Sequence, residues 1–231
     1  MNKKRIANSI YRRYSIFFDA VNRNALVAQW TREYRPPLYL NTRNEIYRYV
    51  AAELGNGSAI DLLEFGVAEG TSMRALVHAN QNPESRFVGF DTFAGLPEDW
   101  QSGWGVIRKG SYAVRQDRPY FDDARISLQV GLFQDTVPKF LTTFTPANQL
   151  IFHIDCDLYS STLYLLTKLD AFRSLQPIIL FDDFSSPLHV FRAFTDYVGA
   201  YQVSYRCLAA AGSYFDQVCV QLQQSSTVGP E

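Results

Sequence analysis

The sequence predicts an α/β protein built on a doubly wound parallel sheet of seven strands. Two observations lead to this fold class. From residue 60 onward, short apolar runs rich in β-branched and aromatic residues alternate with longer segments of helical periodicity, as strands and helices alternate in such sheets. Several of these runs end on a glycine or an aspartate, which is typical of strands whose carboxyl ends carry a binding site.

The first 40 residues are predicted to form a helical extension and a linker. Apolar residues recur at roughly helical spacing through residues 2–30, among several arginines, which predicts an amphipathic helix. Such a helix packs on its own domain or on a partner subunit, and a basic one can also lie on a membrane. The prolines of Arg35-Pro36-Pro37-Leu38 interrupt the helix.

The main domain is expected over residues 41–222, followed by a polar, disordered tail over 223–231. Its predicted strands cover residues 60–65, 87–90, 126–130, 150–154, 177–181, 203–208 and 214–222. Its predicted helices cover residues 42–54, 71–80, 135–143, 158–172 and 188–200. Pro138 fits its helix only in the first turn. The last two strands have no helix between them, so we expect a hairpin with one antiparallel strand at a sheet edge.

Composition excludes several classes of protein. The 22 basic and 23 acidic residues nearly cancel, so no overall field indicates a nucleic-acid-binding protein. The three cysteines, Cys156, Cys207 and Cys219, lack C-x-x-C spacing, which favours free thiols in a reducing compartment. No apolar run has the length of a membrane span, and no secretory apolar core follows the basic N-terminus. We therefore expect a cytoplasmic protein.

Two predicted strands bring four carboxylates to one edge of the sheet. Asp155 and Asp157 follow the strand at 150–154, and Asp182 and Asp183 follow the strand at 177–181. Carboxylates this close repel one another unless a cation or a shared proton intervenes. Oxygen ligands favour Mg²⁺, Ca²⁺ or Mn²⁺ over Zn²⁺. We therefore predict a divalent metal site with a general base beside it, although Asp157 or Asp183 could instead cap a helix.

The turn after the first predicted strand favours a positively charged ligand. Residues 64–70, E-F-G-V-A-E-G, lead into a helix that Thr71 and Ser72 open as caps. The turn lacks the G-x-G-x-x-G pattern of dinucleotide-binding proteins. Its two glutamates oppose a pyrophosphate and suit the sulfonium and ammonium groups of S-adenosylmethionine. The alternative is a plain strand-to-helix turn.

Asp91 strengthens the prediction of a nucleoside site. It ends the second predicted strand, about twenty residues beyond Gly70, where a carboxylate can accept both ribose hydroxyls. Gly131 and Phe133 follow the third strand and are expected to flank the adenine, although Phe133 could equally belong to the core. Nicotinamide and S-adenosylmethionine proteins share this signal, so it indicates a nucleoside and not a reaction.

Five blocks of the sequence, taken in order, resemble the macrocin O-methyltransferase family. They are E-F-G-V-A-E-G-T-S, V-G-F-D-T-F-A-G-L-P, V-G-L-F-Q-D-T-V-P, H-I-D-C-D-L-Y-S-S-T and L-F-D-D-F, within residues 40–200. Members of this family are class I, S-adenosylmethionine-dependent and magnesium-dependent sugar O-methyltransferases of macrolide and aminocoumarin biosynthesis. The resemblance implies a seven-stranded, Rossmann-like class I methyltransferase sheet with a C-terminal antiparallel hairpin, in an enzyme of natural-product biosynthesis.

The resemblance also implies roles for individual residues. Asp155, Asp182 and Asp183 would hold Mg²⁺, and Asp157 would be the general base. Together with the turn and strand ends above, it predicts that S-adenosylmethionine is bound by Glu64, Gly66, Gly70, Thr71, Ser72, Asp91, Gly131 and Phe133. This sequence departs from the family at Cys156, where a small residue is usual and where we expect a packing role, and at His153, where arginine is common.

These observations predict methyl transfer to a hydroxyl of a small-molecule acceptor. A divalent cation that coordinates the hydroxyl lowers its pKa, and Asp157 takes the proton. We expect a vicinal diol on a sugar or a glycosylated metabolite. The aromatic loop over residues 93–120 is long enough to be a lid that forms one wall of the acceptor site. His189 is expected to lie on a helix surface or to touch the acceptor or the metal.

Two other functions stay open at this level. The first is an NAD(P)-dependent oxidoreductase, against which the missing third glycine and the acidic turn argue. The second is a non-catalytic nucleoside-binding or assembly protein that uses its N-terminal helices as an interaction surface. The oligomeric state also stays open, with a homodimer through the N-terminal helices as one alternative.

Overall fold

The computed structural model describes residues 21, 24–102, 105–115, 118–212 and 214–224. The chain divides into two compact units, residues 1–35 and 36–231. In the first unit, residues 24–33 are helical, and the rest of the helix predicted over 2–30 lies largely outside the described residues. Most of the predicted tail, from residue 225, also lies outside them. No helix in the described part of the chain is long and apolar enough to cross a bilayer.

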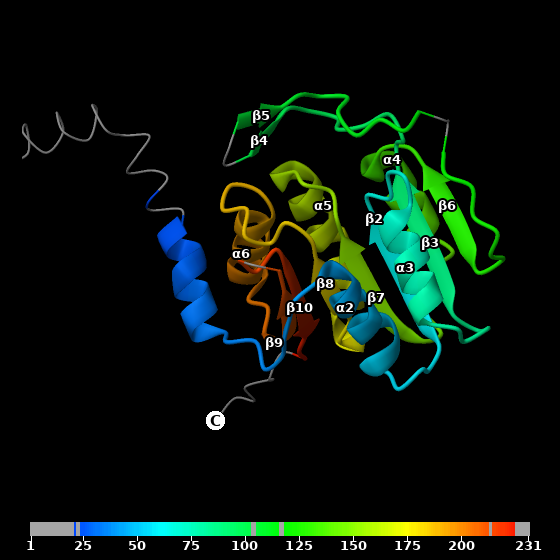
Figure 1. Cartoon of the computed structure of the whole chain (residues 1–231), viewed down its shortest axis with the longest axis horizontal. Helices are drawn as coiled ribbons and strands as arrows, with labels where there is room; N and C mark the ends of the chain where they lie inside the picture. The colour runs from blue at the N-terminus through cyan, green and yellow to red at the C-terminus, as the bar shows by residue number, and fades with distance from the viewer. Residues whose placement is uncertain (1–20, 22–23, 103–104, 116–117, 213, 225–231) are drawn as a thin grey trace, which may run out of the picture. The chain divides into compact units, whose positions relative to one another are not determined.

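The second unit contains a sheet of eight strands in the order β1-β9-β10-β8-β7-β2-β3-β6. The strands are β1 (Tyr39–Leu40), β2 (Ile60–Phe65), β3 (Arg86–Asp91), β6 (Ile126–Val130), β7 (Gln149–Ile154), β8 (Ile178–Phe181), β9 (Tyr205–Ala211) and β10 (Gln217–Leu222). All seven predicted strands are present, and the two-residue β1 adds an eighth beside β9. The predicted α/β class with a mostly parallel, doubly wound sheet is confirmed (Figure 1).

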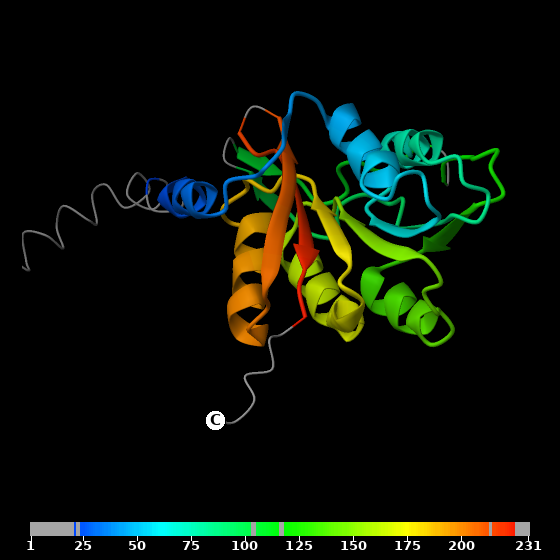
Figure 2. The same ribbon diagram turned by 90° about the horizontal axis from the view of Figure 1, so that it is seen from below.

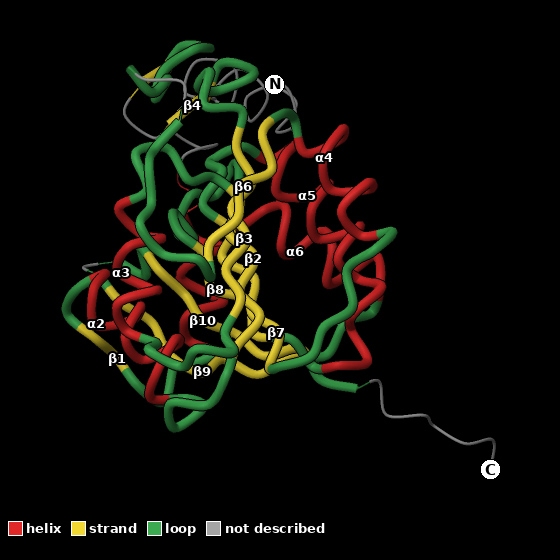
Figure 3. Tube along the Cα trace, turned by 90° about the vertical axis from the view of Figure 1, so that its right-hand side faces the viewer, coloured by secondary structure: helices red, strands yellow, loops and turns green. Residues whose placement is uncertain are grey.

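Helices cover both faces of this sheet. They are α2 (Arg43–Arg48), which continues as a π-helical segment over Tyr49–Glu53, α3 (Thr71–Ala79), α4 (Phe133–Leu141), α5 (Tyr159–Leu169), which continues as a 3₁₀ segment over Asp170–Leu175, and α6 (Val190–Tyr201). Seen along the sheet, α2 and α3 lie on one face and α4, α5 and α6 on the other (Figures 2 and 3). Every residue of β2 is buried, as expected for a central parallel strand covered on both sides.

The prediction for the last two strands needs a correction. β9 and β10 do form the expected antiparallel pair, but the antiparallel strand is not at an edge: β10 lies between β8 and β9 and is antiparallel to both. An interior position satisfies the backbone donors and acceptors on both sides of β10, whereas an edge would leave one row unpaired.

The helix α4 begins two residues earlier than predicted, at Phe133. Pro138 is therefore beyond its first turn and cannot donate to the carbonyl of Gln134, four residues before it. Gln134 is exposed, so water can reach its carbonyl, and the helix continues through the proline to Leu141.

The long segment between β3 and β6 contains a second, small sheet. β4 (Trp100–Ser102) and β5 (Gly105–Ile107) form an antiparallel hairpin. This hairpin lies above α5 at the top of Figure 1. Residues 103–104 and 116–117 of the predicted lid lie outside the described residues.

Candidate active site

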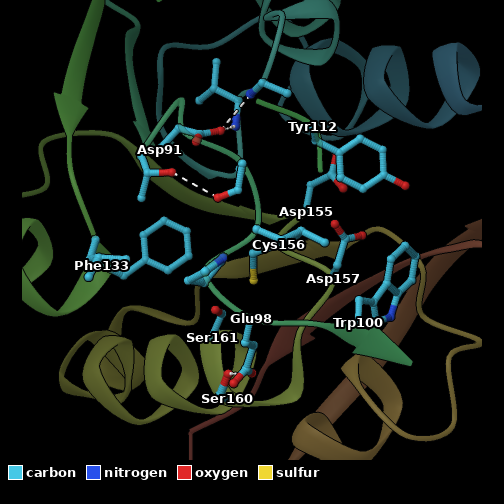
Figure 4. A pocket seen from close by; sticks show the side chains of 18 of the residues that line it. Asp91, Glu98, Trp100, Tyr112, Phe133, Asp155, Cys156, Asp157, Ser160 and Ser161 are labelled. Carbon is cyan, nitrogen blue, oxygen red and sulfur yellow. Dashed lines mark hydrogen bonds between the residues drawn. The ribbon is translucent and has the colours of Figure 1, made fainter. Parts of the chain in front are cut away.

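A cavity of about 730 Å³ opens at the carboxyl ends of the central strands, within the size range of small-molecule sites, roughly 300–1,000 Å³. Its walls come from the ends of β2, β3, β7 and β8, the start of α4, and the segment around β4. Seven of the predicted site residues line it: Gly66, Asp91, Phe133, Asp155, Asp157, Asp182 and Asp183. The topology therefore brings both predicted half-sites, the nucleoside end and the acidic end, into one space (Figure 4).

Asp91 closes the turn after β2 by hydrogen bonding. Its Oδ2 accepts the backbone N–H groups of Val67 and Ala68, both at 2.8 Å, and its Oδ1 accepts the N–H of Phe93 at 2.7 Å. Phe133, at the start of α4, lies on the same side of the cavity (Figure 4) and contacts Phe65 edge-on at a ring distance of 5.8 Å. A carboxylate, a glycine turn and an aromatic ring are thus gathered at one end of the cavity.

The other predicted cofactor residues are set back from the cavity. Glu64, Gly70, Thr71, Ser72 and Gly131 are not among the described residues that line the cavity. Glu64 is fully buried and bonds to His153 Nδ1 at 3.0 Å and to the Ser72 hydroxyl. Gly70 lies against the ring of Phe121, where a Cβ would come within 2.5 Å of a ring carbon. Glu64 thus ties the end of β2 to α3 and β7 without lining the cavity.

The four acidic residues form the opposite end of the cavity. Asp157 and Asp183 have positive φ values of 60° and 47°, a region that aspartate tolerates better than most residues. Asp182 is 2% exposed. Its Oδ1 accepts the backbone N–H of Asp183 at 3.0 Å and the side-chain amide of Gln217. Arg43 also contacts Asp182, with its guanidinium 2.9 Å from Oδ2.

Crowding of these carboxyl groups changes their acidity. Burial and then the charges of Asp182 and Asp157 hold the pKa of Asp155 well above its usual range. Burial, followed by a hydrogen bond to Asp183 and that residue's charge, raises the pKa of Asp157 to about 8. Burial and the charge of Asp182 raise the pKa of Asp183. With a pKa of about 8, Asp157 holds a proton at neutral pH when no cation is present.

The acidic residues fit a divalent cation in type and in charge. Their ligand atoms are carboxylate oxygens, which Mg²⁺ and Mn²⁺ prefer. Burial, followed by the charges of neighbouring carboxyl groups, raises the pKa of Asp155, Asp157 and Asp183, and a bound cation would offset both effects. Among the residues that the structure describes, however, no three acidic, histidine or cysteine side chains are already arranged as a metal site. Metal binding would therefore require side chains to rotate.

A segment that includes β4 covers the acidic end. Trp100 lines the cavity and contacts the His189 ring edge-on at 6.2 Å. His189 Nε2–H donates to the carbonyl of Gln101 at 3.0 Å, and its Nδ1 accepts the backbone N–H of Tyr159, the first residue of α5, at 3.3 Å. The Ser160 hydroxyl donates to Glu98 of the same segment (Figure 4). His189 is thus neither free on a helix surface nor a cavity residue, because it fastens the covering segment to α5.

Sequence reasoning missed two described residues of the acidic end, Arg43 and Tyr112. Arg43 did have a signal, because a basic residue directly after the helix cap Thr42 opposes the helix dipole and suggests a nearby acid. Tyr112 had none, because its place depends on a loop with a positive φ of 65°. Burial and the charges of Asp157 and Asp183 raise the pKa of Tyr112. Cys156, whose predicted role was packing, is buried with its Sγ 3.5 Å from the Thr162 hydroxyl, and it also lines the cavity.

A comparison with models of known protein families identifies the family of this chain. Residues 43–216, more than half of the chain, match the model of the macrocin O-methyltransferase (TylF) family. The chain belongs to the macrocin O-methyltransferase family. The predicted enzyme class, an S-adenosylmethionine-dependent O-methyltransferase, is confirmed at the level of the family.

Solved structures with a similar fold are also methyltransferases. The O-methyltransferase NovP matches with a TM-score of 0.55 and 22% identity over 78% of each chain. The calicheamicin methyltransferase CalS11 matches with a TM-score of 0.55 and 21% identity, over 80% of this chain and 81% of that one. An O-methyltransferase from Bacillus cereus, solved with S-adenosylhomocysteine, matches with a TM-score of 0.51 and 14% identity, over 88% of this chain and 91% of that one. At these identities the likeness supports the fold alone. No protein with a curated description matches the sequence.

Proposed function

We propose that this enzyme transfers the methyl group of S-adenosylmethionine to a hydroxyl of a sugar or another vicinal diol. In this proposal Asp155, Asp182 and Asp183 hold Mg²⁺ or a similar cation, and Asp157 is the general base. The observation that carries it is the joining of the Asp91 turn and the four acidic residues in one cavity of about 730 Å³. One end then binds the nucleoside and the other activates the acceptor.

The turn at Asp91 supports a cationic nucleoside over a dinucleotide. The N–H groups of Val67 and Ala68 already donate to Asp91, so they are not free for a pyrophosphate, which relies on such groups. The same carboxylate faces the cavity, and because three backbone N–H groups take up three of its roughly four lone-pair sites, it keeps about one for a ribose hydroxyl. Glu64, buried behind the turn, would act on the cofactor through the turn and not by lining the cavity. Gly66 would let the cofactor approach the backbone, and Phe133 would contact the adenine.

The acidic end supports deprotonation of an alcohol. In the reaction the acceptor oxygen forms a bond to the methyl carbon, the carbon–sulfur bond breaks, and its electron pair stays on sulfur as S-adenosylhomocysteine. The hydroxyl proton passes to Asp157. A bound cation would supply positive charge that lowers the pKa of the acceptor hydroxyl. The same charge would lower the pKa of Asp157 from about 8, so that it could accept a proton at neutral pH.

The walls near the acidic end suit a sugar. Trp100 and Tyr112 line the cavity beside Asp155 and Asp157 (Figure 4). An aromatic side chain can contact the apolar face of a sugar ring while oxygen ligands bind its hydroxyl edge. The family resemblance implies sugars as acceptors, and the family match names macrocin. Cytoplasmic location and a dimer through the N-terminal helices stay predictions.

Calorimetric titrations with S-adenosylhomocysteine and with NAD test the cofactor. We expect binding of the first alone, whereas NAD binding would favour the oxidoreductase. The acceptor is tested by incubating enzyme, S-adenosylmethionine and Mg²⁺ with sugars and glycosylated compounds that carry vicinal diols, and with the same compounds after their diols are blocked as acetals. Mass spectrometry should find a methylated product only with the free diol and only without EDTA. Cofactor binding without transfer to any diol would favour the non-catalytic alternative.

A further inference from the structure

Arg43, whose side chain is half-exposed, forms an ion pair with Asp182, a buried acid of the candidate metal site. Its Nη2 lies 3.2 Å from Oδ1 and 2.9 Å from Oδ2 of Asp182. The Arg43 side chain is 54% exposed, whereas that of Asp182 is 2% exposed. Water can thus reach one partner of the pair and hardly the other, so the guanidinium is the group that can leave.

The position of Arg43 is not explained by its own helix. It is the first residue of α2, directly after the capping residue Thr42. A basic residue at the amino end of a helix opposes the helix dipole, at a cost of about 0.3–1 kcal/mol. Its favourable contact is therefore with the acidic residues on the neighbouring strand ends.

Arg43 occupies the side of Asp182 that a cation would need. Oδ1 of Asp182 also accepts the amide of Gln217 and the backbone N–H of Asp183. Among the contacts of the described residues, Oδ2 meets only Arg43. Oδ2 is therefore the oxygen that becomes available to a metal ion when the guanidinium moves.

The electrostatic surroundings agree with this role. Burial lowers the pKa of Arg43, but the charges of Asp182, Asp155 and Asp183 and the nearby Tyr47 outweigh that effect and raise it. One guanidinium thus acts on all four acidic residues, because its charge also lowers the pKa of Asp157, and it partly offsets their repulsion.

We propose that Arg43 is the internal counter-ion of the acidic residues and competes with the divalent cation for Asp182, so that it sets the enzyme's metal affinity. This inference rests on the proposed metal site. It predicts that a cation binds only when the guanidinium is displaced, and that neutralising Arg43 strengthens metal binding. A purely supporting role, in which Arg43 holds Asp182 in place for the metal, predicts the opposite sign.

The test is calorimetric titration of the full-length enzyme with Mn²⁺ alone. Arg43→Gln should bind Mn²⁺ about tenfold more tightly or better, because a unit charge beside the ion is removed. Arg43→Lys keeps the charge and should stay close to wild type. Arg48→Gln is the matched control, because Arg48 lies on the same helix and pairs at 3.0 Å with the exposed Glu53. In Arg43→Gln/Asp182→Asn the gain should disappear.

Thermal unfolding of each variant shows whether it is folded. If Arg43→Gln is not folded, the Mn²⁺ affinity of Arg43→Lys is compared with that of the wild type instead. If the wild type binds Mn²⁺ and Arg43→Gln binds it no more tightly, the proposed role of Arg43 is wrong, whereas the metal site is still supported. If only Arg43→Lys folds, weaker Mn²⁺ binding by that variant leads to the same conclusion. Binding by Arg43→Gln but not by wild type supports the inference and removes metal dependence from the proposed function. No binding by any variant overturns both.

Discussion

Gly66 lies directly against the backbone of Asp155. A Cβ on Gly66 would lie 1.8 Å from the carbonyl oxygen of Asp155 and 2.7 Å from its carbonyl carbon, and the φ of Gly66 is +96°. The glycine therefore permits the end of β2 and the end of β7 to touch. This contact joins the turn at the nucleoside end to the loop that carries the acidic residues.

We expect Gly66→Ala to destabilise the enzyme by roughly 3 kcal/mol or more, because the added carbon meets rigid backbone and the residue keeps a left-handed conformation. Urea unfolding measures the change. Gly199→Ala is the control: Gly199 is in α6 with no atom within 4 Å of its added Cβ, and alanine favours helix by up to about 1 kcal/mol. Equal stability of the two variants would contradict the contact.

Asp157→Asn should remove the general base and leave the fold intact. Asparagine tolerates the positive φ of 60° at this position, so the backbone has no reason to move. We expect kcat to fall about a hundredfold to ten-thousandfold, while calorimetry gives the wild-type affinity for S-adenosylhomocysteine. Asp122→Asn, at an exposed acid outside the cavity, should keep the wild-type rate. A variant at position 157 that keeps most of its kcat would exclude this role.

Asp91→Asn should weaken cofactor binding. The new amide would turn a donor toward the backbone N–H groups of Val67 and Ala68, or of Phe93. A ribose hydroxyl would also lose its charged acceptor, and because a hydrogen bond to a charged group contributes about 1.5–3 kcal/mol, the dissociation constant for S-adenosylhomocysteine should rise about ten- to a hundredfold. Glu84→Gln, an exposed acid just before the other end of β3, should bind normally. Unchanged affinity in Asp91→Asn would show that the cofactor binds elsewhere.

His189 should make stability depend on pH. Burial lowers the pKa of His189, although the bond to Gln101 and the charge of Glu98 act in the opposite direction. The unfolded chain therefore binds a proton more readily than the folded one, and this stabilisation is present above about pH 6.5 and is lost as the pH falls through the folded pKa. Protonation also prevents Nδ1 from accepting the N–H of Tyr159.

We expect the unfolding temperature of the wild type to decrease between about pH 6.5 and pH 5 more steeply than that of His189→Phe, which keeps an aromatic ring beside Trp100. The profile of His78→Gln, at an exposed position on α3, should follow the wild type. Parallel profiles for wild type and His189→Phe would show that this ring does not fasten the covering segment.

Local patterns were enough to predict the framework. The alternation of strands and helices can be recognised from short runs of residues. All seven main strands and the helices between them were therefore predicted close to their observed positions. Asp91, Asp155 and Asp182 line one cavity because each follows or ends a parallel strand, and the carboxyl ends of such strands meet at one edge. The family blocks then indicated the chemistry.

The contacts between distant segments were beyond the sequence. Arg43 and Asp182 are 139 positions apart, and His189 and Gln101 are 88 apart, with no periodicity that links either pair. The insertion of β10 between β8 and β9 likewise depends on pairing across the whole sheet. The sequence by itself therefore determined the fold class and the strand-end carboxylates that reach the cavity, because periodicity and strand ends are local. Only the tertiary structure decided which cation faces Asp182, which ring fastens the covering segment and why residue 66 is glycine, because these depend on packing between elements.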